Sequence, residues 1–133
     1  MSPTRLARIS LVLAGIGVLG FGVPLLVRPS LLGIVGIELT RPAAATEIRS
    51  FYGGLEIGLA VFFFAAARRD AWLRPALFAQ AAGFGGIVAG RLVGFLADGS
   101  AEPMLFAFIA LEASGALLGA VALWRLTRGG AGS

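Results

Sequence analysis

The sequence contains no cysteine, no histidine and no lysine. Without cysteine there is no disulfide framework, no thiolate chemistry and no iron–sulfur ligation. Without histidine the chain lacks an ordinary haem ligand, the commonest metal ligand and the usual proton shuttle at neutral pH. Without lysine it cannot form a Schiff base. These absences exclude most membrane redox enzymes as a stand-alone function, and the sequence predicts no metal site and no cofactor.

Charge is also scarce. Only 14% of the 133 residues are charged and 58% are hydrophobic, with a mean hydropathy of +0.92. Soluble domains are about a quarter charged, so we expect a membrane domain. All 11 basic residues are arginine, which together with the many alanines and glycines indicates a bacterial source. Because the arginines flank apolar runs and do not form a stripe, nucleic-acid binding is not expected.

Four apolar runs are long enough to cross a bilayer, which takes about 20 residues. The run from 9 to 27 has no charge and no small-residue cleavage site, so we expect a retained helix and not a signal peptide. The fold class predicted is all-α: a four-transmembrane-helix bundle forming one domain over 1–128, with 129–133 as a disordered tail. The spans are expected at 9–27, 46–67, 73–97 and 103–126.

The connection between the first two spans is too apolar for a free loop. Pro29 and Ser30 start a new element, and six aliphatic residues follow within the next nine positions. A short helix lying in the membrane interface is the expected form. An irregular loop that covers the bundle is the alternative.

The arginines predict the orientation of the spans. Seven of them belong to the two termini or to the 68–74 turn, against two or three on the opposite side. Since cytoplasmic loops carry the excess of basic residues, both termini are expected in the cytoplasm and the protein in the bacterial inner membrane. Trp72 and Trp124 then share the cytoplasmic interface. The seven are Arg5, Arg8, Arg68, Arg69, Arg74, Arg125 and Arg128.

Three charged residues lie well inside the predicted spans, more than one helical turn from either end. At about 1.5 Å per residue, Glu56, Arg91 and Glu112 each lie roughly 9–12 Å below the outer end of their helix, in one polar layer. On an α-helix the spacing of Arg49 and Tyr52 places them on the face of Glu56, and Asp98 follows Arg91 toward the outer surface. The predicted network is Arg49, Tyr52, Glu56, Arg91, Asp98 and Glu112.

This layer has two interpretations. It is either a buried salt bridge that sets the register of the helices, or a pocket in which a carboxylate binds a proton, a cation or a ligand head group. Glycines at four-residue spacing predict close helix packing around it. These helix-packing glycines are Gly54 and Gly58, then Gly86, Gly90 and Gly94, then Gly115 and Gly119.

The motifs also resemble a known family. The segment from Phe51 to Glu56 (FYGGLE), the Gly90-Arg91 pair, Asp98-Gly99 and Glu112 are similar to a family of small bacterial four-helix membrane proteins known only as a domain of unknown function. That family broadly resembles the DoxX-like proteins, some of which are accessory to quinone-linked membrane complexes. The resemblance covers about residues 9–126 and implies a fold, but no activity.

Three functional classes follow. We expect a non-enzymatic accessory or scaffold protein, or a lipid- or ligand-binding one, because no nucleophile–base pair is visible. Its partners would be the lipid bilayer, further copies in a homo-oligomer or a larger membrane complex, and a lipid or quinone-like ligand. The alternative is an oligomeric small-molecule or proton/cation-coupled carrier that uses Glu56 or Glu112. The third class, an enzyme, is not expected.

Overall fold

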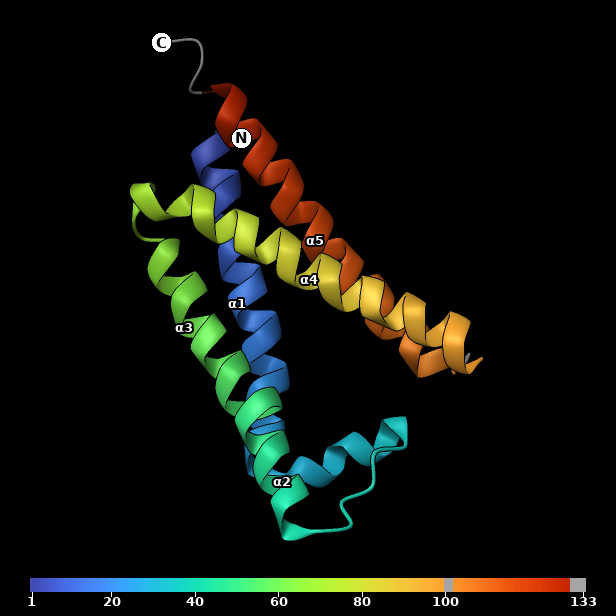
Figure 1. Cartoon of the computed structure of the whole chain (residues 1–133). Coiled ribbons are helices and arrows are strands. Elements are labelled where there is room, and N and C mark those ends of the chain that lie inside the picture. Colours follow the sequence, from blue (N-terminus) through green and yellow to red (C-terminus); the bar gives the residue numbers. More distant parts are fainter. Residues whose placement is uncertain (100–101, 130–133) are drawn as a thin grey trace. The chain divides into compact units, whose positions relative to one another are not determined.

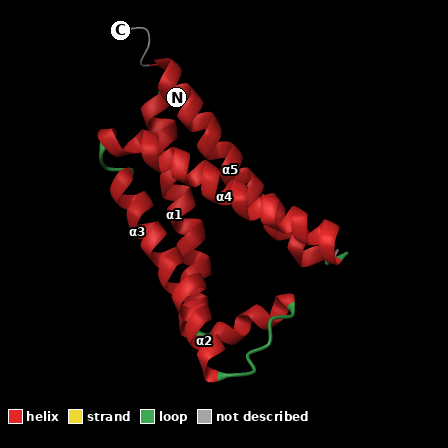
Figure 2. Cartoon of the chain, viewed as in Figure 1, coloured by secondary structure: helices red, strands yellow, loops and turns green. Residues whose placement is uncertain are grey.

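The computed structural model describes residues 1–99 and 102–129 (Figure 1). These residues form five α-helices and two short helices of other geometry, with no strand among them (Figure 2). The predicted all-α class is therefore confirmed for the described part of the chain. The elements are α1 (Pro3–Val27), η1 (Pro29–Val35), α2 (Pro42–Ile48), η2 (Arg49–Gly54), α3 (Leu55–Ala66), α4 (Asp70–Asp98) and α5 (Pro103–Gly129).

Four helical stretches are long and apolar enough to cross a membrane. The second of them combines α2, η2 and α3 into one continuous run. This matches the number of predicted spans and indicates a membrane protein. The stretches are Pro3–Val27, Pro42–Ala66, Asp70–Asp98 and Pro103–Gly129.

The chain divides into two compact units. The terminal unit comprises Met1–Leu11 and Ala66–Ser133, and the central unit comprises Val12–Ala65. The terminal unit thus contains the first turns of α1 with α4 and α5, while the central unit contains the rest of α1 with η1, α2, η2 and most of α3. Each unit has its own set of polar contacts.

In the central unit, η1 follows α1 almost directly. It is a seven-residue 3₁₀ helix, Pro29–Val35, and it is followed by Gly36, whose φ of 81° lies in the left-handed region that glycine tolerates. The predicted short helix is thus present, with 3₁₀ geometry. Its buried Leu32 packs with Leu25 of α1 and Ile48 of α2 in a small apolar cluster, which Phe21, Val35 and Leu39 extend.

The terminal unit is built on the hairpin of α4 and α5. Leu73 and Leu77 of α4 and Ala122 of α5 are buried, as are Ala7 and Leu11 of α1. α4 begins at Asp70, before the predicted start, and ends at Asp98, where the following Gly99 has a left-handed conformation. α5 extends through Gly129, the first residue of the predicted tail, whereas residues 130–133 lie outside the described part.

Candidate functional site

Arg91 and Glu112 form the central ion pair of the terminal unit. The Arg91 Nε and Nη2 atoms each donate a hydrogen bond of 2.8 Å to a separate Glu112 carboxylate oxygen. The Arg91 guanidinium also lies 5.2 Å from the centre of the Phe108 ring. The side chains of Arg91 and Glu112 are 25% and 15% exposed. The pair is therefore only partly buried, whereas the sequence predicted a buried salt bridge. Two parallel hydrogen bonds fix both position and orientation, and they join α4 to α5.

A second polar contact joins three helices of the same unit. The Ser10 hydroxyl of α1 donates to the Gln80 Oε1 of α4 at 3.0 Å, and the Gln80 Nε2 donates to the Gly115 carbonyl of α5 at 2.9 Å. Ser10 and Gln80 are 0% and 1% exposed. Gln80 therefore uses both ends of its amide to hold α1 and α5 against α4.

Glycines of α5 make room for these contacts. A Cβ added at Gly119 would lie 3.1 Å from the Gln80 Cδ, and one added at Gly115 would lie 3.1 Å from the Phe84 ring. These two predicted packing glycines do lie against another helix. At Gly58, Gly86 and Gly90 an added Cβ would meet no atom of the described residues within 4 Å. At Gly54 and Gly94 it would meet only an atom of the same helical stretch.

Arg49 has a different role in the central unit from the predicted one. Its Nε donates a hydrogen bond of 3.1 Å to the carbonyl of Leu26, which lies one residue before the end of α1. The last carbonyls of a helix lack intrahelical partners, and a cation is favourable at that end of the helix dipole. Arg49 thus caps α1, whereas its spacing in the sequence predicted a place in the polar network around Glu56.

The geometry of η2 differs from the regular α-helix that the predicted face assumed. Residues Arg49–Gly54 are π-helical, and the Leu55 N–H bonds to the Ser50 carbonyl five residues earlier. The face predicted for Arg49, Tyr52 and Glu56 assumed the α-helical period of 3.6 residues. In the wider turn Gly53 is buried, whereas Arg49 and Tyr52 are exposed.

Glu56 lies where α1 passes very close to this wider turn. A Cβ added at Gly22 would lie 2.7 Å from the Glu56 Cβ, and one added at Gly53 would lie 2.9 Å from the Leu26 Cα. Gly22 and Gly53 were not among the predicted packing glycines. Glu56 belongs to the central unit and Arg91 to the terminal unit, so the three-residue layer of Glu56, Arg91 and Glu112 stays a prediction. Asp98 is exposed at the last position of α4.

Comparison with known families identifies the family of this chain. Residues 6–123 match the family described as a domain of unknown function (DUF4345). The chain belongs to this family. No curated protein and no solved structure matches the chain. The match agrees with the predicted membership of a family of unknown function, while the DoxX-like kinship stays a prediction.

Sequence reasoning missed the contact between Ser10 and Gln80. The signal for it was present, because each is the only uncharged polar side chain in its predicted span. Polar side chains inside apolar helices tend to hydrogen-bond across helices. The close approach at Gly22 and Gly53 had no comparable signal in a chain with 20 glycines.

Proposed function

We propose that the chain is a multi-pass membrane protein with a non-enzymatic accessory or scaffold role. The observation that carries this proposal is the bidentate Arg91–Glu112 pair, in which each charge is neutralised by a residue of the neighbouring helix. Charged groups within spans are costly unless paired, and here the pair joins two helices. Among the described residues, no buried side-chain nitrogen or oxygen lacks a hydrogen-bond partner. This completeness favours a structural role for the intramembrane polar groups over a catalytic one.

The apolar surface supports an accessory role. Leu96 of α4 and Leu111 and Leu117 of α5 are 89%, 68% and 66% exposed. In a bilayer such faces contact lipid tails or the helices of another subunit. The protein would act by binding neighbouring helices, in a homo-oligomer or in a larger membrane complex.

The proposed location is the bacterial cytoplasmic membrane, with both termini in the cytoplasm. The N-terminal turns of α1 and α4 and the last turn of α5 border one pocket of the terminal unit. The seven arginines of the two termini and the 68–74 turn therefore belong to the same end of that unit. Such an arginine-rich end is expected to remain on the cytoplasmic side.

Flux measurements in liposomes test the accessory role against ion transport. We expect the reconstituted protein to give no proton or cation flux above that of empty liposomes, and Glu56→Gln to change nothing. Glu38→Gln is the matched control, because it removes the same charge from an exposed position between η1 and α2. Flux that Glu56→Gln abolishes and Glu38→Gln preserves would overturn the proposal.

A further inference from the structure

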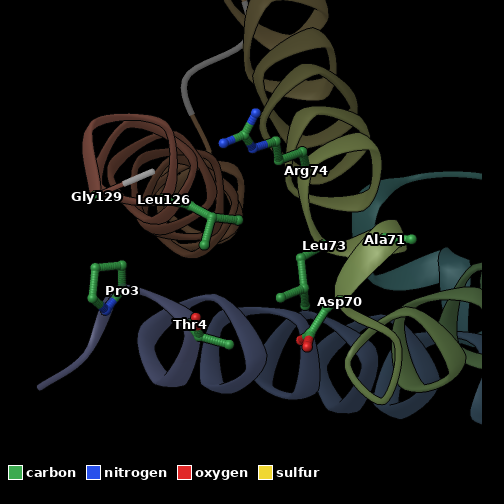
Figure 3. A pocket seen from close by; sticks show the side chains of 8 residues that line it. All are labelled: Pro3, Thr4, Asp70, Ala71, Leu73, Arg74, Leu126 and Gly129. Atoms are coloured by element: carbon green, nitrogen blue, oxygen red, sulfur yellow. The ribbon is translucent and has the colours of Figure 1, made fainter. Parts of the chain in front are cut away.

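A pocket opens at the arginine-rich end of the terminal unit, away from the Arg91–Glu112 pair. It has a volume of about 470 Å³, within the range of about 300–1,000 Å³ that is usual for small-ligand sites. Its walls come from the start of α1, the start of α4 and the end of α5 (Figure 3). The lining residues are Pro3, Thr4, Asp70, Ala71, Leu73, Arg74, Leu126 and Gly129.

The charges around this pocket favour an anion. Among the described residues of the lining, Asp70 is the only acidic one, and its carboxylate accepts a hydrogen bond of 2.9 Å from the Arg8 guanidinium, so the two charges offset each other. Arg74 is exposed, and it makes no hydrogen bond or ion pair within the described part of the chain. Figure 3 shows its side chain extending from α4 toward α5. A guanidinium in this position can donate two parallel hydrogen bonds to a phosphate.

The helix ends at the pocket make smaller electrostatic contributions, one that favours an anion and one that opposes it. The N-terminus of α4 has no side-chain cap from Arg69, and its first residues Asp70 and Ala71 line the pocket, where the helix dipole favours an anion. The C-terminus of α5 at Gly129 also borders the pocket and opposes this effect. The positive charge of Arg74 therefore decides that the pocket favours an anion.

The rest of the lining is apolar and suits a lipid better than a free ion. Pro3 and Leu126 line the pocket with hydrocarbon, and the buried Leu73 forms part of its wall. Two tryptophans lie at this end, each under an arginine: the Arg69 guanidinium is 4.6 Å from the Trp72 ring centre and that of Arg128 is 4.4 Å from the Trp124 ring centre. Tryptophans are typical of the level at which lipid head groups sit.

We propose that this pocket binds the head-group phosphate of an anionic phospholipid, with Arg74 as the phosphate ligand and the Thr4 hydroxyl as a second donor. Basic pockets between helices on the cytoplasmic side commonly hold such head groups. The inference rests on the membrane placement proposed above, but it does not depend on the accessory role.

The test is native mass spectrometry of the full chain in detergent with an equal mixture of phosphatidylglycerol and phosphatidylcholine. We expect phosphatidylglycerol to be retained preferentially, and Arg74→Gln to reduce this preference about tenfold or more, because the charge-assisted hydrogen bonds of the guanidinium to the phosphate are lost. Arg125→Gln is the matched control, since it removes an equal charge from an exposed residue of α5 outside the lining. If Arg74→Gln and Arg125→Gln reduce the phosphatidylglycerol preference equally, the lipid is attracted by the overall positive charge of this end and not bound in the pocket, and the proposal is overturned.

A second variant separates binding from folding. Ala71→Glu places a carboxylate in the lining and in the first turn of α4, where it favours the helix. We expect it to abolish the lipid preference without lowering the melting temperature. Retention of the preference, or displacement of the lipid by millimolar inorganic phosphate, would overturn the lipid assignment. Recovery of the chain as a detergent-free soluble protein would instead contradict its membrane placement.

Discussion

At the scale of single residues, the polar side chains of the apolar helices are engaged by their neighbours. Arg91 has two well-aligned hydrogen bonds to Glu112, and Gln80 is hydrogen-bonded at both ends of its amide. In hydrocarbon an unsatisfied charge or amide costs several kcal/mol. Removing one partner should therefore cost much more than removing both.

A double-mutant cycle on Arg91 and Glu112 tests this asymmetry. Arg91→Ala strands the Glu112 carboxylate and is expected to destabilise the protein by about 3 kcal/mol. Adding Glu112→Gln should recover a large part of that loss, because the stranded charge is removed. The measurement is the free energy of unfolding in detergent micelles.

The control for this cycle is Arg125→Ala, an exposed residue that forms no ion pair among the described residues. It should change the stability by no more than about 0.5 kcal/mol. Strictly additive effects of Arg91→Ala and Glu112→Gln would show that the pair is not energetically coupled.

At the scale of elements, the π-helical turn η2 organises the central unit. Within this turn the Ser50 Oγ donates a hydrogen bond of 3.0 Å to the Thr46 carbonyl, the kind of side-chain contact that helps to satisfy the backbone where helix geometry changes. Gly53 allows the turn to approach the backbone of α1 at Leu26. Turns of this type are frequent at functional positions, and here the turn holds Arg49 on the end of α1.

The neighbouring glycines Gly53 and Gly54 give a matched test of that approach. Gly53→Ala would place a Cβ 2.9 Å from the Leu26 Cα, a backbone atom that cannot move without shifting α1. We expect a loss of about 1–3 kcal/mol from overpacking. Gly54→Ala meets only the Arg49 carbonyl at 3.6 Å, and it should stabilise the helix by about 0.5–1 kcal/mol.

Thermal unfolding of both variants in the same detergent measures the difference. The two changes add the same methyl group to adjacent positions, so effects on the unfolded chain are closely matched. Equal shifts in melting temperature for Gly53→Ala and Gly54→Ala would contradict the close approach of η2 to α1.

At the scale of the whole molecule, the uneven distribution of arginine determines the expected topology. Seven of the 11 basic residues belong to the termini and the 68–74 turn. Moving that end across the membrane would require all of these charges to cross the bilayer. The prediction is that the two termini stay in the cytoplasm while η1 lies on the outer side.

Cysteine labelling checks this topology, since the natural chain has no cysteine. Ser30→Cys in η1 should react with a membrane-impermeant maleimide in intact spheroplasts, whereas Ser2→Cys should react only after permeabilisation. Both serines are exposed. Two further serines would suit the same labelling, Ser100 between the third and fourth predicted spans and Ser133 at the C-terminal end. Both lie outside the described residues. The reverse labelling pattern would contradict the orientation.

Sequence alone determined the class of the fold and the candidate spans. Long apolar runs interrupted at Pro29, Asp70 and Pro103 leave few alternatives to four helices, because backbone groups in lipid must be satisfied within the segment. The short helix after the first span was also predictable, from proline followed by aliphatic residues. These features depend on local composition, which a single sequence displays in full.

Only the tertiary structure decided which polar groups meet. Helix rise placed Glu112 and Arg91 at similar depth, but depth does not determine how each helix is rotated about its axis, and rotation decides the partner. The π-helical turn changed that rotation within Arg49–Gly54, so Arg49 met the Leu26 carbonyl. The packing of α1, α4 and α5 likewise brought Ser10, Gln80 and the Gly115 carbonyl together from positions up to 105 residues apart. Isolated polar residues in the spans mark the candidates for such contacts, but the rotation and close approach of the helices decide which of them meet.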